Sequence, residues 1–166
     1  MHTPGKICYF GIYRPTAPRD KVYIEGLKKA GMNVVECVDN SGGFLKFFRL
    51  VRKLRSLLGQ YDIIWVGYLS TMIVPLAWFF SPNKIIYNAL DSWYDRAITD
   101  RAMHWRFSPK ALLMWLSDFL AFLLSHIILV ESEQQKLFIS KSFCDLKNFF
   151  VTRNQKFFHR VLRRCN

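Results

Sequence analysis

Short runs of β-branched and aromatic residues alternate with longer segments of helical character, and this alternation constrains the fold more than any other feature of the chain. The runs cover residues 6–12, 33–38, 61–67, 84–88, 127–130 and 148–152. Most are too short for helices and apolar enough for strands that are buried on both faces. Strands that alternate with helices predict an open, mainly parallel sheet with helices on both faces and right-handed crossovers. We therefore expect a Rossmann-like α/β domain.

Helix boundaries are marked most clearly in the second half of the chain. Ser108, which a proline follows, predicts the start of a helix that runs to about Leu124. Ser132 and Gln135 have the spacing of a capping box and predict the start of another helix. In the first half, Gly31 predicts the end of a helix that begins near residue 20, because glycine is favoured just past a helix end.

Two further helices are predicted between the strands of the first half. Residues 44–58 place Phe, Val and Leu at helical spacing, with Lys and Arg on the other side. Residues 70–80 look helical up to the Ser81-Pro82 step, where proline disfavours continuation. The polar stretch 91–107 is longer than ordinary connections, and such loops are more often functional.

A membrane span over residues 111–130 is an alternative to a helix followed by a strand. This window carries one formal charge, Asp118. About a dozen Leu, Ile, Phe and Val, at roughly −0.3 to −0.6 kcal/mol each, outweigh one central Asp at about +2.5 to +3.5 kcal/mol. The Ser125-His126 break and the capping box that follows favour the helix and strand.

The chain has room for about one domain, and it is strongly basic. Of its 166 residues, 24 are Lys or Arg and 12 are Asp or Glu, which gives a net charge of +12. Such a charge favours an anionic partner, such as a membrane surface, nucleic acid or a phosphorylated ligand. We assign residues 1–152 to the α/β domain and residues 153–166 to a basic C-terminal tail.

The usual catalytic and metal-binding motifs are absent from the sequence. There is no phosphate-binding glycine loop, nucleophile elbow or zinc-protease motif. The four cysteines and four histidines lack metal-ligand spacing, so we assign no metal and expect a reducing, cytoplasmic environment.

The loops that follow the strands are the places to look for a ligand, because open parallel sheets bind ligands at their carboxyl edge. After the first strand, Arg14 and Thr16, beside Tyr13, offer a guanidinium and a hydroxyl to a phosphate or a sugar. The alternative is a surface turn stiffened by its prolines.

The loop after the fourth strand gathers carboxylates, aromatic rings and arginines. Carboxylates accept hydrogen bonds from sugar hydroxyls, and aromatic rings cover the apolar face of a sugar. Asp91 or Asp95 is therefore a candidate general base toward an acceptor hydroxyl. The remaining candidate substrate-binding residues here are Trp93, Tyr94, Arg96, Asp100 and Arg101. The alternative is that Asp95-Arg96 and Asp100-Arg101 form ion pairs on a solvated loop.

In the order and spacing of these segments, the chain resembles the N-terminal domain of family 4-type glycosyltransferases with the GT-B fold. The segments that carry the resemblance are 61–67, Val74-Pro75-Leu76-Ala77, Ser92-Trp93-Tyr94-Asp95 with Asp100-Arg101, and 127–130 with Glu131-Ser132. The resemblance covers residues 6–152. It implies an acceptor-binding lobe, with Asp95 and the loop after the first strand facing the cleft between lobes and with Glu131 among the substrate-binding residues.

The sequence differs from this family in features that affect the expected sugar-transfer activity. The glycine pair that often follows the first strand is replaced by Tyr13-Arg14-Pro15, and the segment 149–158 lacks the expected linker glycine and aspartate. By this resemblance we expect the tail to correspond to a truncated linker without the donor-binding lobe. We expect no cofactor, with a nucleotide-sugar donor bound only by a second lobe or a separate donor-binding subunit. Transfer by this chain alone is not expected, because reacting atoms must be held between both lobes.

The basic segments predict contact with the cytoplasmic face of a membrane. Helix 44–58 and the segment 141–164 mix apolar and basic residues, as helices on anionic lipid surfaces do. The candidate membrane-contacting residues are Lys46, Arg49, Arg52 and Lys53. The acceptor is then a glycan or a lipid-linked sugar. The alternative function is a non-enzymatic basic module on a membrane or nucleic acid, and nucleic acid is the less favoured because no recognition motif is present.

Overall fold

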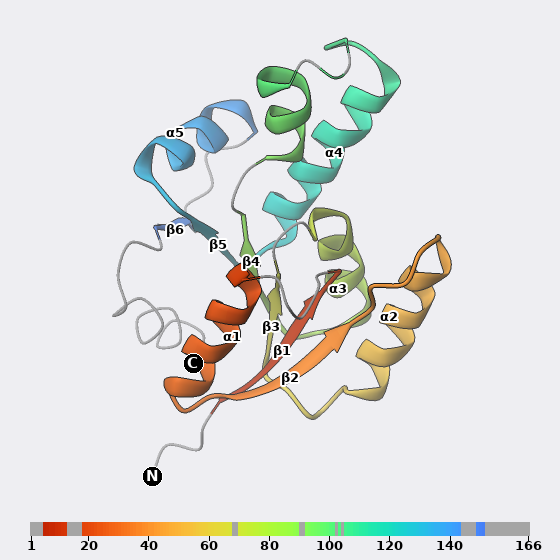
Figure 1. The fold of residues 1–166 in the computed structure, drawn as a ribbon, viewed down its shortest axis with the longest axis vertical. Helices are drawn as coiled ribbons and strands as arrows, with labels where there is room; N and C mark the ends of the chain where they lie inside the picture. Colours follow the sequence, from red (N-terminus) through yellow and green to blue (C-terminus); the bar gives the residue numbers. More distant parts are fainter. Residues whose placement is uncertain are drawn as a thin grey trace.

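The computed structural model describes most of the chain and shows an α/β domain (Figure 1). The described residues are 5–12, 18–67, 70–89, 92–101, 103, 105–143 and 149–151, and for 99, 100, 150 and 151 the backbone alone is described. The predicted tail at 153–166 lies outside this part of the chain.

The sheet has six strands, all parallel, in the order β2-β1-β3-β4-β5-β6. This arrangement confirms the predicted Rossmann-like fold. The strands are β1 (Lys6–Gly11), β2 (Asn33–Val38), β3 (Ile63–Val66), β4 (Lys84–Asn88), β5 (Ile127–Val130) and β6 (Phe149–Val151). The central strands are almost wholly buried, which explains why they read as continuous apolar runs rather than as alternating ones.

Helices cover both faces of the sheet, as predicted, but unequally. Among the described residues, α1 (Pro18–Lys29) alone packs on one face, over a cluster that includes Tyr9 and Trp65. The opposite face carries the larger cluster and four helices, α2 (Leu45–Ser56), α3 (Val74–Phe80), α4 (Pro109–Leu124) and α5 (Glu133–Ser142). This distribution follows from right-handed crossovers, because the chain reverses direction across the sheet after β2.

The predicted helix ends are found at the predicted residues. Gly31 adopts a φ of 82°, the left-handed conformation that glycine tolerates best, just after α1. Ser108 Oγ accepts a hydrogen bond from the Ala111 amide at 3.1 Å, and Ser132 Oγ accepts one from the Gln135 amide at 3.1 Å. Both serines therefore act as N-caps. The predicted helix at 70–80 begins as a 3₁₀ turn, η1 (Thr71–Ile73), and continues as α3.

Residues 111–130 form a helix and a strand rather than one long helix. α4 ends at Leu124, Ser125 is extended, and β5 enters the sheet beside β4. Across the described ranges, no helix has both the length and the apolar character that a bilayer crossing requires.

His126 lies between α4 and β5, and we expect it to make stability depend on pH. Its Nδ1 accepts a hydrogen bond from the Ile85 amide at 3.1 Å, which requires an unprotonated nitrogen. Partial burial and the positive charge of Lys84 lower the pKa of His126. As the pH falls through the ordinary histidine pKa of about 6.5, the unfolded chain takes up this proton before the folded chain does.

The free energy of unfolding should therefore decrease as the pH falls below neutral, and this decrease should level off below the lowered pKa of the folded chain. Urea unfolding at several pH values measures the dependence, and His126→Gln should remove part of it. An unchanged slope in His126→Gln would show that other groups cause the dependence.

Candidate functional site

The candidate site lies at the carboxyl edge of the sheet, where β1 and β3 are neighbours. The chain runs from β1 to β2 on one side and then returns to β3 on the other, so the strand order reverses at this point. Open α/β sheets bind ligands at such a reversal. The loops on its two sides are joined there, because the Ile12 amide donates a hydrogen bond to Ser70 Oγ at 3.1 Å.

The start of α1 forms one wall of this edge and is held by polar side chains. Asp20 is buried, and its Oδ1 accepts a hydrogen bond from the Tyr9 hydroxyl at 2.8 Å. A carboxylate in the first turn of a helix is also stabilised by the helix dipole. These contacts fix the first turn of α1 at the end of β1.

An ion pair connects α1 with the residue that follows β5. Arg19 Nη2 lies 2.6 Å from Glu131 Oε1. Arg19 belongs to α1, which follows β1, whereas Glu131 follows β5, and the ends of β3 and β4 lie between these two strands. The ion pair therefore joins the start of α1 to the segment after β5, and it brings the predicted substrate-binding residue Glu131 into contact with α1.

Asn88, the last residue of β4, is a buried polar side chain at the carboxyl edge of the sheet. Alternation along β4 places Asn88 on the same face as Ile86, which is the face that α1 covers. Its side chain is 2% exposed, and its Nδ2 has no hydrogen-bond partner in the part of the chain that the structure describes. A buried, unpaired amide donor costs about 1–3 kcal/mol. Asn88 is therefore a candidate hydrogen-bond donor for a ligand at the carboxyl edge.

The segment after β4 is organised by a carboxylate from α4. Asp118 is fully buried, and its Oδ2 accepts hydrogen bonds from Ser92 Oγ at 2.6 Å and from the Tyr94 amide at 2.8 Å. Ser92 Oγ in turn accepts a hydrogen bond from the Asp95 amide at 3.0 Å. This network places the predicted residues Trp93, Tyr94 and Asp95 at the start of a helical turn.

The stretch predicted as a long polar loop thus contains η2 (Asp95–Asp100), a short π-helical segment. Trp93, Tyr94, Asp95 and Arg96 are partly buried, and Arg101 is exposed. Asp95 forms no ion pair with Arg96 or with any other side chain in the described part of the chain, so its carboxylate remains available to a ligand. Tyr13, Arg14, Thr16, Asp91 and the Asp100 side chain lie outside the described residues.

Sequence reasoning did not select Asn88, Asp118 or Arg19. Asn88 was visible as a polar residue at the end of an apolar strand, and Asp118 as the one formal charge in a long apolar segment. Each pattern indicates a special position, but neither says which residues will lie beside it in the fold.

The basic residues predicted to contact a membrane lie on α2 and differ in their surroundings. Arg49 Nε forms an ion pair with Asp39 Oδ2 at 2.7 Å. Hydrogen bonds from the Ser41 hydroxyl and from Arg49 lower the pKa of Asp39 to about 2. Lys46 Nζ lies 5.4 Å from the centre of the Phe47 ring. Arg52 and Lys53 are exposed to solvent.

The sheet order and the reversal between β1 and β3 define a Rossmann-like α/β domain. Comparison with protein-family models and with curated proteins finds no match for this chain. Within the described residues, no group of three or more His, Cys, Asp or Glu side chains is placed to hold a metal ion.

Proposed function

We propose that this chain is the acceptor-binding domain of a glycosyltransferase and that it binds a sugar at the carboxyl edge of its sheet. The observation that carries the proposal is the unpaired amide of buried Asn88, which is the last residue of β4 and so lies at the carboxyl edge of the sheet. A buried donor of this kind is matched by a hydroxyl or phosphate oxygen of a ligand. In this proposal the ligand is a sugar, because the chain resembles glycosyltransferases in the segments 61–67, 92–101 and 127–132.

Each residue of the site has a distinct role in this proposal. The Trp93 and Tyr94 rings cover an apolar sugar face, while Asn88 and Glu131 bind hydroxyls. Asp95 accepts the proton of the acceptor hydroxyl as that oxygen bonds to the anomeric carbon of the donor sugar, and the nucleotide leaves with the electron pair of the sugar–phosphate bond that breaks. A second domain, on another polypeptide or in a longer form of the chain, binds the nucleotide-sugar.

The same proposal places the protein at the cytoplasmic face of a membrane as a peripheral protein. The exposed cations Arg52 and Lys53 on α2 support it, because each basic residue near an anionic leaflet contributes about 1 kcal/mol. Lipid-linked sugars are acceptors that such a location makes available.

Replacing Asn88 by leucine should change the stability of the fold and the binding of the sugar in opposite directions. Leucine has a similar size and removes an unpaired amide, so the free energy of unfolding should rise by about 1 kcal/mol. Binding of the acceptor sugar should weaken at least tenfold, because its hydrogen-bond donor is lost. Urea unfolding and NMR titration with a panel of oligosaccharides and water-soluble glycolipids measure the two effects.

Asn83 provides the matched control for this substitution. Its Nδ2 donates a hydrogen bond to the Tyr61 carbonyl at 2.7 Å, so Asn83→Leu should lower stability and leave sugar binding intact. If no sugar in the panel shifts resonances of Trp93, Tyr94 or Asn88, the glycosyltransferase proposal is wrong. Binding to RNA or DNA alone would instead favour a basic module without transfer activity.

A further inference from the structure

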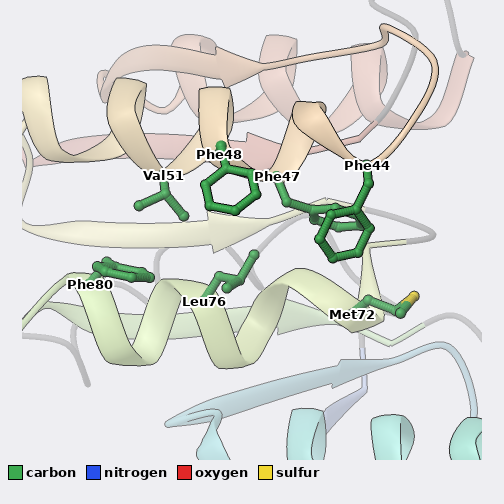
Figure 2. A pocket seen from close by; sticks show the side chains of 7 residues that line it. All are labelled: Phe44, Phe47, Phe48, Val51, Met72, Leu76 and Phe80. Carbon is green, nitrogen blue, oxygen red and sulfur yellow. The ribbon is translucent and has the colours of Figure 1, made fainter.

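An apolar groove runs between α2 and α3 on the outer side of the helix layer. Figure 2 shows the side chains of α2 and of the η1–α3 segment pointing toward one another across it. Its volume is about 360 Å³, within the range of pockets that hold a single small ligand. Its lining is entirely apolar and consists of Phe44, Phe47, Phe48, Val51, Met72, Leu76 and Phe80.

Only part of this groove takes part in packing α2 on the sheet. The contact with the core is made by Leu50 and Leu54, which are fully buried, and by Phe47 and Leu57, which are partly buried. Phe44, Phe48 and Val51 follow one another at i, i+4 and i+7 and form a separate stripe along the helix. Phe44 and Phe48 are 73% and 67% exposed. Exposed aromatic side chains gathered at one groove indicate a binding surface.

Unpaired cations lie on the same helix. Arg55 continues the stripe of Phe44, Phe48 and Val51 by helical spacing, and Arg52 lies one residue beyond Val51. Both are exposed, and neither forms an ion pair with a carboxylate of the described residues. Arg49, by contrast, is already neutralised by Asp39. Helical spacing therefore places Arg55 one turn beyond Val51, so positive charge is expected next to the apolar groove.

We propose that this groove binds one hydrocarbon chain of an anionic lipid, with the lipid headgroup at Arg52 and Arg55. The apolar lining matches the chain, and the two guanidinium groups match a headgroup phosphate. The charge disfavours a second copy of the protein, because a symmetric contact would bring the basic α2 helices of two chains with a net charge of +12 together. The inference rests on the membrane association in the proposed function, but not on sugar transfer.

The first test is a titration of the full chain with phosphatidylglycerol whose acyl chains are short enough to keep the lipid monomeric, followed by native mass spectrometry. We expect one bound lipid per chain. The double variant Phe44→Ser/Phe48→Ser should bind it about tenfold more weakly, because it removes apolar contact area. The matched control is Trp105→Ser/Phe107→Ser, a pair of similarly exposed rings outside the groove, and it should bind the lipid as the unmodified chain does.

The second test examines how much Arg52 and Arg55 contribute to lipid binding. Arg52→Gln/Arg55→Gln should weaken binding of the same lipid roughly thirtyfold, as expected if each arginine contributes about 1 kcal/mol. Lys28→Gln/Lys29→Gln removes the same charge from α1, on the opposite face of the sheet, and should change binding less than threefold. A short-chain phosphatidylcholine should bind more weakly than phosphatidylglycerol.

Sedimentation with phosphatidylglycerol vesicles separates this inference from the proposed function. If the chain binds vesicles but not the monomeric lipid, or if the Phe44 and Phe48 substitutions have no effect on lipid binding, the groove does not hold a lipid chain although membrane association stands. If the chain binds neither vesicles nor monomeric lipid, the lipid site and the membrane association are both wrong, whereas the sugar-binding proposal is tested separately. Self-association that Phe44→Ser/Phe48→Ser abolishes would overturn the inference in favour of a second copy.

Discussion

Replacing Asp118 by alanine is expected to lower the free energy of unfolding by about 3 kcal/mol. The carboxylate accepts hydrogen bonds from Ser92 Oγ and the Tyr94 amide, and bonds to a charged group contribute roughly 1.5–3 kcal/mol each. Alanine leaves both donors buried without their acceptor, while relief of the cost of burying Asp118 offsets part of the loss. Urea unfolding measures the change.

The same substitution should also loosen the candidate site. Hydrogen exchange of the amides at 92–97 should become faster, because Ser92 and Tyr94 lose the side chain that holds them. Asp118→Asn keeps one acceptor oxygen and should lose about half as much stability. If Asp118→Ala unfolds at the same urea concentration as the unmodified chain, Asp118 does not organise this segment.

Replacing Trp65 by alanine is expected to have the largest effect on stability, a loss of about 3–5 kcal/mol. Trp65 lies in β3, is fully buried, and packs on the rings of Tyr9 and Tyr23 at centroid distances of 6.4 and 5.7 Å. In the described part of the chain α1 is the one helix on this face, so little else is placed to fill the cavity. Thermal and urea unfolding measure the loss.

Trp105→Ala is the control, because it removes a tryptophan that is not part of the core. Trp105 is exposed, so its removal should change stability by no more than about 0.5 kcal/mol. Equal effects of the two substitutions would contradict the placement of Trp65 in the core.

Predictions that depended on neighbouring residues in sequence are confirmed by the structure. Ser108 and Ser132 cap their helices, and Gly31 ends α1, because each of these contacts joins residues a few positions apart. The strands were recognisable because a parallel sheet buries both faces, which requires nearly continuous apolar runs. These local patterns were enough to predict the Rossmann-like fold.

The candidate site was predicted in part. The structure places the segment 92–101 after β4 and Glu131 after β5, at the carboxyl edge, whereas the binding of a ligand there stays a prediction. The π-helical turn at Asp95–Asp100 was not predicted, and the contacts that hold the residues before it are not local, because Asp118 is 26 residues from Ser92 in sequence. The general-base role of Asp95 stays a prediction.

The sequence by itself determined the order of the strands and of the α-helices, since periodicity, caps and turn residues act over one or two helical turns. Only the tertiary structure decided which polar groups are buried without partners and which apolar side chains remain uncovered. Asn88 and the groove of Phe44 and Phe48 became visible in this way. The physical reason is that burial and pairing depend on residues brought together from distant parts of the chain, whereas local patterns record only what adjacent residues prefer.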